Sequence, residues 1–156
     1  MDDAGFEELV RANERLVFGL ARGVLGDFAE AEDVAQDVFL RAYRKLEGLR
    51  DRQKFRAWVA RMSIRLALNR RRGLRRAHVR DAEWLRGAPP AVAPASDLAL
   101  RQAIARLPHK LRSVLLLCAV EGMDAAEVAR ILRVPDGTVR SRLHLARKQL
   151  LLEVGP

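Results

Sequence analysis

The sequence predicts an all-α protein, with two small helical domains joined by a flexible linker. Ala, Leu, Arg and Glu dominate the composition, and the alternating polar and apolar runs typical of strands are scarce. Apolar residues recur instead at helical spacing in several segments. A stretch rich in Ala and Pro, 87–95, cannot form a regular helix and divides the chain. With 156 residues, 49% of them hydrophobic, each part has room for a modest core.

Two helices are expected first. The apolar spacing predicts one over 6–25, ended near Gly26, and a second from Asp27 or Glu30 to Leu46, with Tyr43 in its inward stripe. The second helix is acidic at its start and basic at its end, which complements the helix dipole. No His or Cys accompanies these carboxylates, so we expect neither a metal site nor a catalytic site there.

A polar loop over 47–54 leads to a third helix, expected over 55–72, in which Trp58 is assigned to the core. Eight arginines and no Asp or Glu lie between 61 and 80. Such a density of uncompensated positive charge favours a face that meets phosphate.

The C-terminal part predicts two helices and then a helix-turn-helix. Ser96 or Asp97 is expected to cap the first helix, and Pro108 opens the next, which stops at Gly122. Helical spacing over 123–132 and the turn at 135–137 predict the helix-turn-helix.

Three positions in its turn have expected conformations. Gly137 is expected to use an unusual backbone angle, and Asp136 or Thr138 to cap the last helix. Arg133 stands where a left-handed conformation would favour Gly.

The last helix should pack through Val139, Leu143, Ala146 and Leu150. Its outward face is polar and basic, which suits the major groove of DNA. The expected DNA-binding residues are Thr138, Arg140, Ser141, Arg142, His144, Arg147 and Lys148.

Charge divides the chain as well. Residues 1–48 hold 11 acidic and 6 basic side chains, whereas the whole chain carries a net charge of +9. The basic remainder favours nucleic acid as a partner. Cys118 is the only cysteine and lies in an apolar run, so a structural role in a reducing cytoplasm is expected. The N-terminus lacks signal-peptide features, and no apolar stretch is long enough for membrane insertion.

Two sets of motifs lie on either side of the linker. The first comprises Ala31-Glu32-Asp33-Val34-Ala35-Gln36-Asp37-Val38-Phe39, Ala42-Tyr43 and Phe55-Arg56-Ala57-Trp58-Val59. The second comprises Leu107-Pro108, Val114-Leu115-Leu116-Leu117, Glu121-Gly122, Glu127-Val128-Ala129 and Gly137-Thr138-Val139-Arg140-Ser141-Arg142-Leu143. In this order they resemble regions 2 and 4 of the bacterial sigma-70 family, in its extracytoplasmic-function (ECF) subgroup.

The resemblance implies a region 2-like domain over 1–72, a linker over 73–96 and a region 4-like helix-turn-helix domain over 97–156. It implies a transcription initiation factor without enzyme activity or cofactor, which binds core RNA polymerase and directs it to promoters. Regions 2 and 4 would recognise the minus-ten and minus-thirty-five elements of promoter DNA. An anti-sigma factor is a further expected partner.

The resemblance also assigns roles to individual residues. Core polymerase would contact Asp33, Gln36, Asp37 and Leu40. The opened minus-ten strand would meet Arg61, Arg65, Asn69 and Arg72. Three residues depart from the family pattern and leave base preference open, namely Leu49, Arg65 and Leu145.

Other classes stay open. A helix-turn-helix repressor or activator would dimerise on a palindrome, but it leaves the N-terminal motifs unexplained. A sigma decoy would bind polymerase without starting transcription. A metal-dependent nuclease, with Asp33 and Asp37 as ligands, is the least favoured class.

Overall fold

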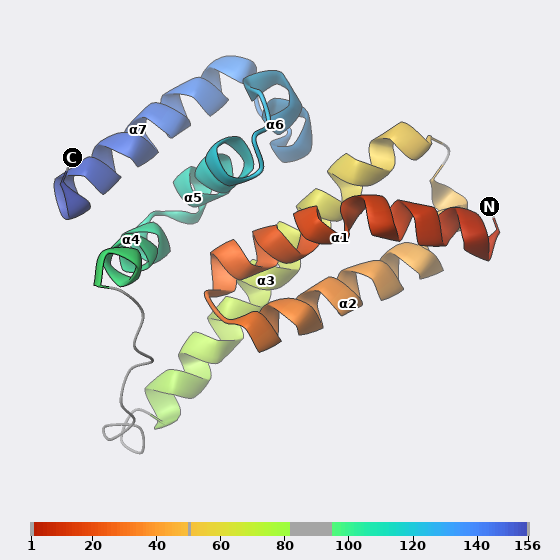
Figure 1. Ribbon diagram of the computed structural model, residues 1–156, viewed down its shortest axis with the longest axis horizontal. Coiled ribbons are helices and arrows are strands. Elements are labelled where there is room, and N and C mark those ends of the chain that lie inside the picture. Colours follow the sequence, from red (N-terminus) through yellow and green to blue (C-terminus); the bar gives the residue numbers. More distant parts are fainter. Residues whose placement is uncertain (1, 50, 82–94, 156) are drawn as a thin grey trace.

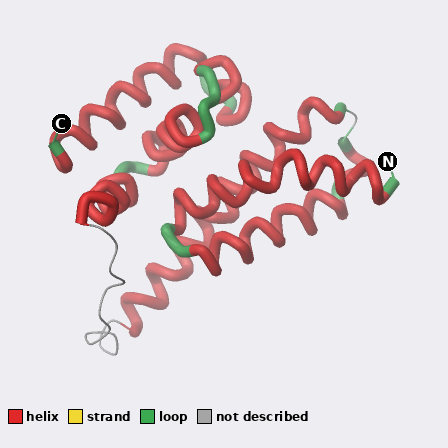
Figure 2. Tube along the Cα trace, in the orientation of Figure 1, coloured by secondary structure: helices red, strands yellow, loops and turns green. Residues whose placement is uncertain are grey.

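A computed structural model of the 156-residue chain describes residues 2–49, 51–81 and 95–155. These residues form helices, turns and loops, and no strand occurs among them (Figure 2), which confirms the all-α prediction. Figure 1 shows two groups of helices. The N-terminal bundle contains α1 (Asp3–Leu25), α2 (Phe28–Arg44) and α3 (Phe55–Asp81). The C-terminal bundle contains α4 (Ala95–Arg106), α5 (His109–Leu115), α6 (Ala125–Leu132) and α7 (Asp136–Val154).

The N-terminal bundle packs α1 between α2 and α3 around buried apolar side chains. Leu20, Val38 and Phe55 are fully buried at its centre. The carboxylates of Asp2 and Asp27 accept hydrogen bonds from backbone N–H groups in the first turns of α1 and α2 and so begin both helices. Gly26 ends α1 in a left-handed conformation with φ of 70°, as predicted.

Two features of this bundle differ from the sequence predictions. The third helix does not end at Arg72 but runs through Gly73 to Asp81, because a single exposed glycine costs a helix only about 1 kcal/mol. Tyr43 is 52% exposed and lies outside the core. Its hydroxyl donates to the Asp3 carboxylate at 3.1 Å, and its ring packs edge-on against Phe6. The polar loop over 47–54 contains two short 3-10 turns, Leu46–Gly48 and Arg52–Lys54.

In the C-terminal bundle, α5 continues into a π-helical turn, Leu116–Val120, before the chain turns at Gly122. Arg112 is buried, and its guanidinium donates to the backbone carbonyls of Ile104, Ala105 and Leu107. This arginine therefore caps the end of α4 and joins it to α5.

The helix-turn-helix forms where it was predicted, but two details of its turn were wrong. Arg133 adopts the left-handed conformation, with φ of 57° and ψ of 48°, as expected. Gly137 has no positive φ and lies inside α7. Asp136 is the first residue of α7 rather than its cap, and Pro135 precedes it without a side-chain capping bond. Likewise, α4 begins at Ala95, so the predicted capping residues Ser96 and Asp97 lie inside the helix.

The two bundles pack directly against each other, and one cluster of buried side chains spans both, while a second, smaller cluster lies within the C-terminal bundle. Leu116 lies against α1 at Gly23, where a Cβ atom would stand 2.6 Å from a methyl carbon of the leucine. Polar contacts flank this packing: Arg56 pairs with Glu127 at 3.1 Å, and Arg71 donates to the Ala105 carbonyl at 2.6 Å. We call this packing the closed arrangement.

Candidate nucleic-acid interface

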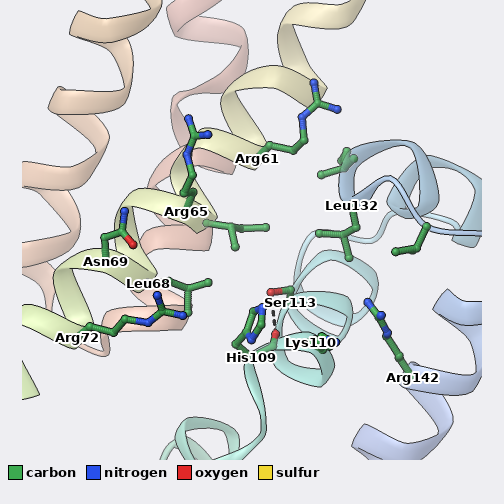
Figure 3. A pocket seen from close by; sticks show the side chains of 13 residues that line it. Arg61, Arg65, Leu68, Asn69, Arg72, His109, Lys110, Ser113, Leu132 and Arg142 are labelled. Atoms are coloured by element: carbon green, nitrogen blue, oxygen red, sulfur yellow. Dashed lines mark hydrogen bonds between the residues drawn. The ribbon is translucent and has the colours of Figure 1, made fainter.

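The four α3 residues predicted to meet the minus-ten strand share one face of that helix. Arg61, Arg65, Asn69 and Arg72 follow each other at intervals of three or four residues, which is the spacing of one helix face. Figure 3 shows these side chains facing residues of α5, α6 and α7 across a cleft of about 430 Å³. We call it the interbundle cleft. Its opposite wall contains His109, Lys110, Ser113, Ile131, Leu132, Val134 and Arg142.

Arg61 also contacts the C-terminal bundle in the closed arrangement. Its Nη1 atom donates to the Arg130 carbonyl at 3.4 Å. Burial lowers the pKa of Arg61, and the positive charge of Arg133 lowers it further. Arg65, Asn69 and Arg72 are exposed, so their polar groups remain accessible from the cleft.

The predicted recognition helix presents most of its candidate residues to solvent. The exposed ones are Arg140, Ser141, His144, Arg147 and Lys148. The Ser141 hydroxyl donates back to the Gly137 carbonyl at 3.0 Å, which leaves its oxygen able to accept a hydrogen bond. Thr138 and Arg142 are half-buried, and Arg142 lines the interbundle cleft rather than the exposed face.

The residues predicted to contact core polymerase lie along the outer side of α2. Asp33 pairs with Arg70 at 3.4 Å, and Asp37 pairs with Arg41 at 3.3 Å. Gln36 is exposed, and Leu40 exposes 57% of its surface. The two ion pairs lie at the surface, where each contributes about 0 to 1 kcal/mol, so a partner can replace them at little cost.

Sequence reasoning missed an apolar groove beside this surface. The groove encloses about 390 Å³ between α1 and α2 and is lined in part by Gln36 and Phe39. Phe28 is 56% exposed there, and its ring packs edge-on against Phe18 at 5.1 Å. The sequence did contain a signal for this groove, because Phe28 directly follows the capping residue Asp27. Periodicity alone, however, does not distinguish an exposed Phe from one in the core.

Sequence reasoning also missed the second wall of the interbundle cleft, since no single helix pattern shows which helices face each other. His109 and Lys110 come from the start of α5, and Arg142 from α7. The pKa of His109 is lowered mainly by partial desolvation. Nearby positive charges lower it further, those of Arg72, Lys110, Arg112 and Arg142. This histidine is therefore neutral at neutral pH.

Other kinds of site find no support in the described part of the chain. No group of three or more His, Cys, Asp or Glu there could hold a metal ion. Within the same residues, no helix is long and apolar enough to cross a membrane. Cys118 is half-buried, and burial raises the pKa of its thiol.

A two-bundle helical protein with a helix-turn-helix and a basic α3 face is a DNA-binding factor by its geometry. Comparison with known proteins identifies the family. Residues 9–77 match the model of sigma-70 region 2, and residues 97–150 match the model of sigma-70 region 4. The chain belongs to the sigma-70 family, in its ECF subgroup, and is a non-catalytic transcription initiation factor that directs RNA polymerase to promoters.

Curated relatives align over nearly the whole chain. RNA polymerase sigma-H factor of Pseudomonas aeruginosa is 33% identical, over 96% of this chain and 86% of its own length. ECF sigma factor SigW of Bacillus subtilis is 28% identical, over 96% of this chain and 88% of its own. ECF sigma factor SigM of Mycobacterium tuberculosis is 30% identical, over 99% of this chain and 79% of its own length.

Solved structures confirm the fold. The sigma factor RpoE of Bartonella quintana, in complex with the anti-sigma factor NepR, is similar with a TM-score of 0.72, 22% identity and coverage of 95% of both chains. CnrH, in complex with the cytosolic domain of CnrY, gives a TM-score of 0.74 and 24% identity, covering 97% of this chain and 88% of its own.

Proposed function

We propose that the exposed face of α7 binds the minus-thirty-five element in the major groove. Support comes from five polar or basic side chains that are exposed together on a helix-turn-helix, with Arg140 and Arg147 as the donors suited to guanine edges. Thr138 lies in the first turn of α7, where a phosphate contact is favourable. Arg142 faces the interbundle cleft in the closed arrangement, so it reaches DNA only after the bundles separate.

The α3 face carries the minus-ten role in this proposal. Arg61, Arg65, Asn69 and Arg72 form a continuous strip of donors for the phosphates and bases of a single strand. The acidic outer side of α2, with Asp33, Gln36, Asp37 and Leu40, binds core polymerase. These assignments correspond to a region 2 domain over 1–72 and a region 4 domain over 97–156; of the expected linker over 73–96, residues 73–81 continue α3 and Ala95 begins α4.

Simultaneous binding to both elements requires the bundles to part. The elements lie about 25 base pairs apart, or roughly 85 Å along B-DNA at 3.4 Å per base pair. In the closed arrangement the bundles touch, with Arg61 only 3.4 Å from the Arg130 carbonyl. The closed arrangement is thus a resting form, and the promoter-bound form is open.

Regulation and location follow from the same role. An anti-sigma factor is proposed as a partner, because the structural relatives RpoE and CnrH were solved in complexes with NepR and CnrY. A protein that works with RNA polymerase on promoter DNA belongs in the bacterial cytoplasm. All reaction chemistry belongs to the polymerase, so the factor itself has no catalytic activity and needs no cofactor.

Run-off transcription with purified core polymerase, this factor and a library of promoter fragments tests the proposal. Specific initiation is expected, and Arg140→Ala should abolish selection at the upstream element, whereas Arg11→Ala, which changes an exposed arginine of α1, should not. Polymerase binding without initiation on any template would identify a decoy. A dimer that protects an operator without polymerase would identify an independent regulator.

A further inference from the structure

The interbundle cleft gathers positive charge from both bundles. Arg61, Arg65 and Arg72 come from α3, Lys110 from α5 and Arg142 from α7 (Figure 3). No Asp or Glu is found among the described residues that line it. Two further hollows adjoin the cleft, one through Arg61 and Arg65 and one through Arg72, and the described lining of each also lacks a carboxylate.

This charge is not neutralised within the described part of the protein. Elsewhere, arginines form ion pairs, such as Arg70 with Glu30 and Arg106 with Glu153. By contrast, the side chains of Arg65, Arg72, Lys110 and Arg142 make no hydrogen bond or ion pair with any described residue. Like charges held together in a partly desolvated site repel each other, so the closed arrangement carries an electrostatic cost that a bound anion would relieve.

We propose that the interbundle cleft binds a linear polyphosphate anion, such as inorganic polyphosphate or the triphosphate of a nucleotide. The cations extend from Arg61 to Arg72, about 16 Å along α3 at 1.5 Å per residue, which favours a linear ligand over a single phosphate. Guanidinium groups bind phosphate oxygens in pairs. A volume of about 430 Å³ lies within the range of small-ligand sites.

The lining of the cleft favours phosphate chains over single-stranded nucleic acid. The described lining of the cleft itself holds no Phe, Tyr or Trp, and that of the adjoining hollow at Arg61 and Arg65 holds only Trp58, so bases would find at most one such aromatic ring on which to stack. Its apolar side chains, including Leu68 and Leu132, lie between the basic ones and donate no hydrogen bonds.

A ligand that touches both walls binds the closed arrangement and not the open one. By linkage it stabilises the closed form and opposes promoter binding, which under the function proposed above requires the open form. The factor would thereby respond to the concentration of polyphosphate or nucleotide. This consequence rests on the proposed function, whereas binding to the cleft does not.

Isothermal titration of the full-length factor with tripolyphosphate, at physiological ionic strength and without Mg²⁺, tests the binding. Lys110→Ala removes a cation from the cleft and should weaken binding about tenfold. Arg11→Ala removes an exposed cation of α1 from outside the cleft and should change binding by no more than about twofold. Equal losses in the two variants, or no binding to the unaltered factor, would overturn the proposal.

Three comparison ligands define the chemistry. Orthophosphate should bind much more weakly than tripolyphosphate, and citrate should too, since a tricarboxylate lacks the linear spacing. Equal affinity for citrate would reduce the cleft to a general anion surface and overturn the assignment to phosphate. Tighter binding of a single-stranded oligonucleotide, lost in Lys110→Ala, would overturn it in favour of nucleic acid. ATP compared with tripolyphosphate separates a nucleotide ligand from an inorganic one, and either result is consistent with the proposal.

Small-angle scattering gives an independent readout of the closed form. Tripolyphosphate should lower or hold the radius of gyration of the factor, whereas an increase would contradict a ligand that bridges the two walls. Run-off transcription without tripolyphosphate separates the two proposals. If the factor initiates specifically but does not bind tripolyphosphate, only the proposal of the cleft site is refuted and the proposed promoter role stands.

Discussion

Gly23→Ala should open the factor without touching any proposed DNA contact. The added Cβ would stand 2.6 and 2.9 Å from the two methyl carbons of Leu116 and 3.3 Å from its Cγ atom. Leu116 is only 3% exposed, so it has little room to move away. Overpacking of this kind costs about 1 to 3 kcal/mol, which raises the ratio of open to closed molecules by roughly 5- to 150-fold.

The same substitution has an opposite effect inside α1. Replacing a glycine in a helix by alanine stabilises that helix by about 0.8 to 1 kcal/mol. The variant should therefore keep or improve the stability of the N-terminal bundle while its contact with the C-terminal bundle weakens. Loss of the fold is not expected, and circular dichroism would verify this.

Scattering and DNA binding provide the assay. Gly23→Ala should increase the radius of gyration and tighten binding of the polymerase-bound factor to a promoter that carries both elements, because simultaneous binding to both requires the open form and the apparent affinity rises with the fraction of open molecules. Gly73→Ala is the matched control: it also replaces a helical glycine, but its Cβ would meet nothing within 4 Å. If the two variants behave alike in both assays, the contact between Gly23 and Leu116 does not hold the bundles together.

Three further outcomes are expected. Arg133→Gly should raise the free energy of unfolding by about 1 kcal/mol in a urea titration, because glycine adopts the left-handed conformation without steric strain. Arg133→Ala keeps the Cβ atom and should therefore raise the free energy of unfolding much less. Arg140→Ala should weaken promoter binding by about 1 to 3 kcal/mol in a titration, and equal losses on random DNA would make Arg140 a phosphate contact only. The pKa of His109 is lowered in the folded protein, so the unfolded chain binds more protons as the pH falls below about 6.5. The free energy of unfolding should therefore decrease below that pH and stay constant above it, as far as His109 contributes. His109→Gln should flatten the dependence of the free energy of unfolding on pH between pH 7.5 and 5.5.

The features that could be predicted from the sequence are those with a local cause. Gly26 ends α1 because glycine adopts φ of 70° without steric cost, and Arg133 occupies the equivalent position after α6 because the turn needs a left-handed residue there. The inward face of α7 follows from helical periodicity, and Val139 and Ala146 are indeed fully buried.

The failures have tertiary causes. Tyr43 fits the apolar stripe of α2, but it lies at the edge of the bundle, where Phe6 covers one side of its ring and Asp3 binds its hydroxyl. Gly73 was expected to end α3 because glycine is a poor helix former, yet the helix continues through it. Gly19 and Gly23 lie inside the first predicted helix, and only the structure shows the chain approaching α1 at both of them through Glu121 and Leu116.

The closed arrangement depends more on packing than on its polar contacts. Arg56 and Glu127 are 44% and 33% exposed, so their ion pair contributes about 1 kcal/mol or less. The hydrogen bond from Arg61 to the Arg130 carbonyl adds about 1 kcal/mol and is long at 3.4 Å. Burial of Leu116 alone is worth about 1.5 to 3 kcal/mol.

Opening also relieves the repulsion among the cleft cations, which offsets part of the lost packing. The net preference for the closed form is therefore smaller than the sum of its contacts, and under the proposed function polymerase and promoter DNA oppose it with their differential binding energy. In the closed arrangement Arg61, Arg65, Asn69 and Arg72 line the interbundle cleft, and under the proposed function the same residues meet DNA in the open form. Under that proposal the α3 face links promoter recognition to the conformation of the free factor, and the proposed cleft ligand would act through that conformation without contacting DNA.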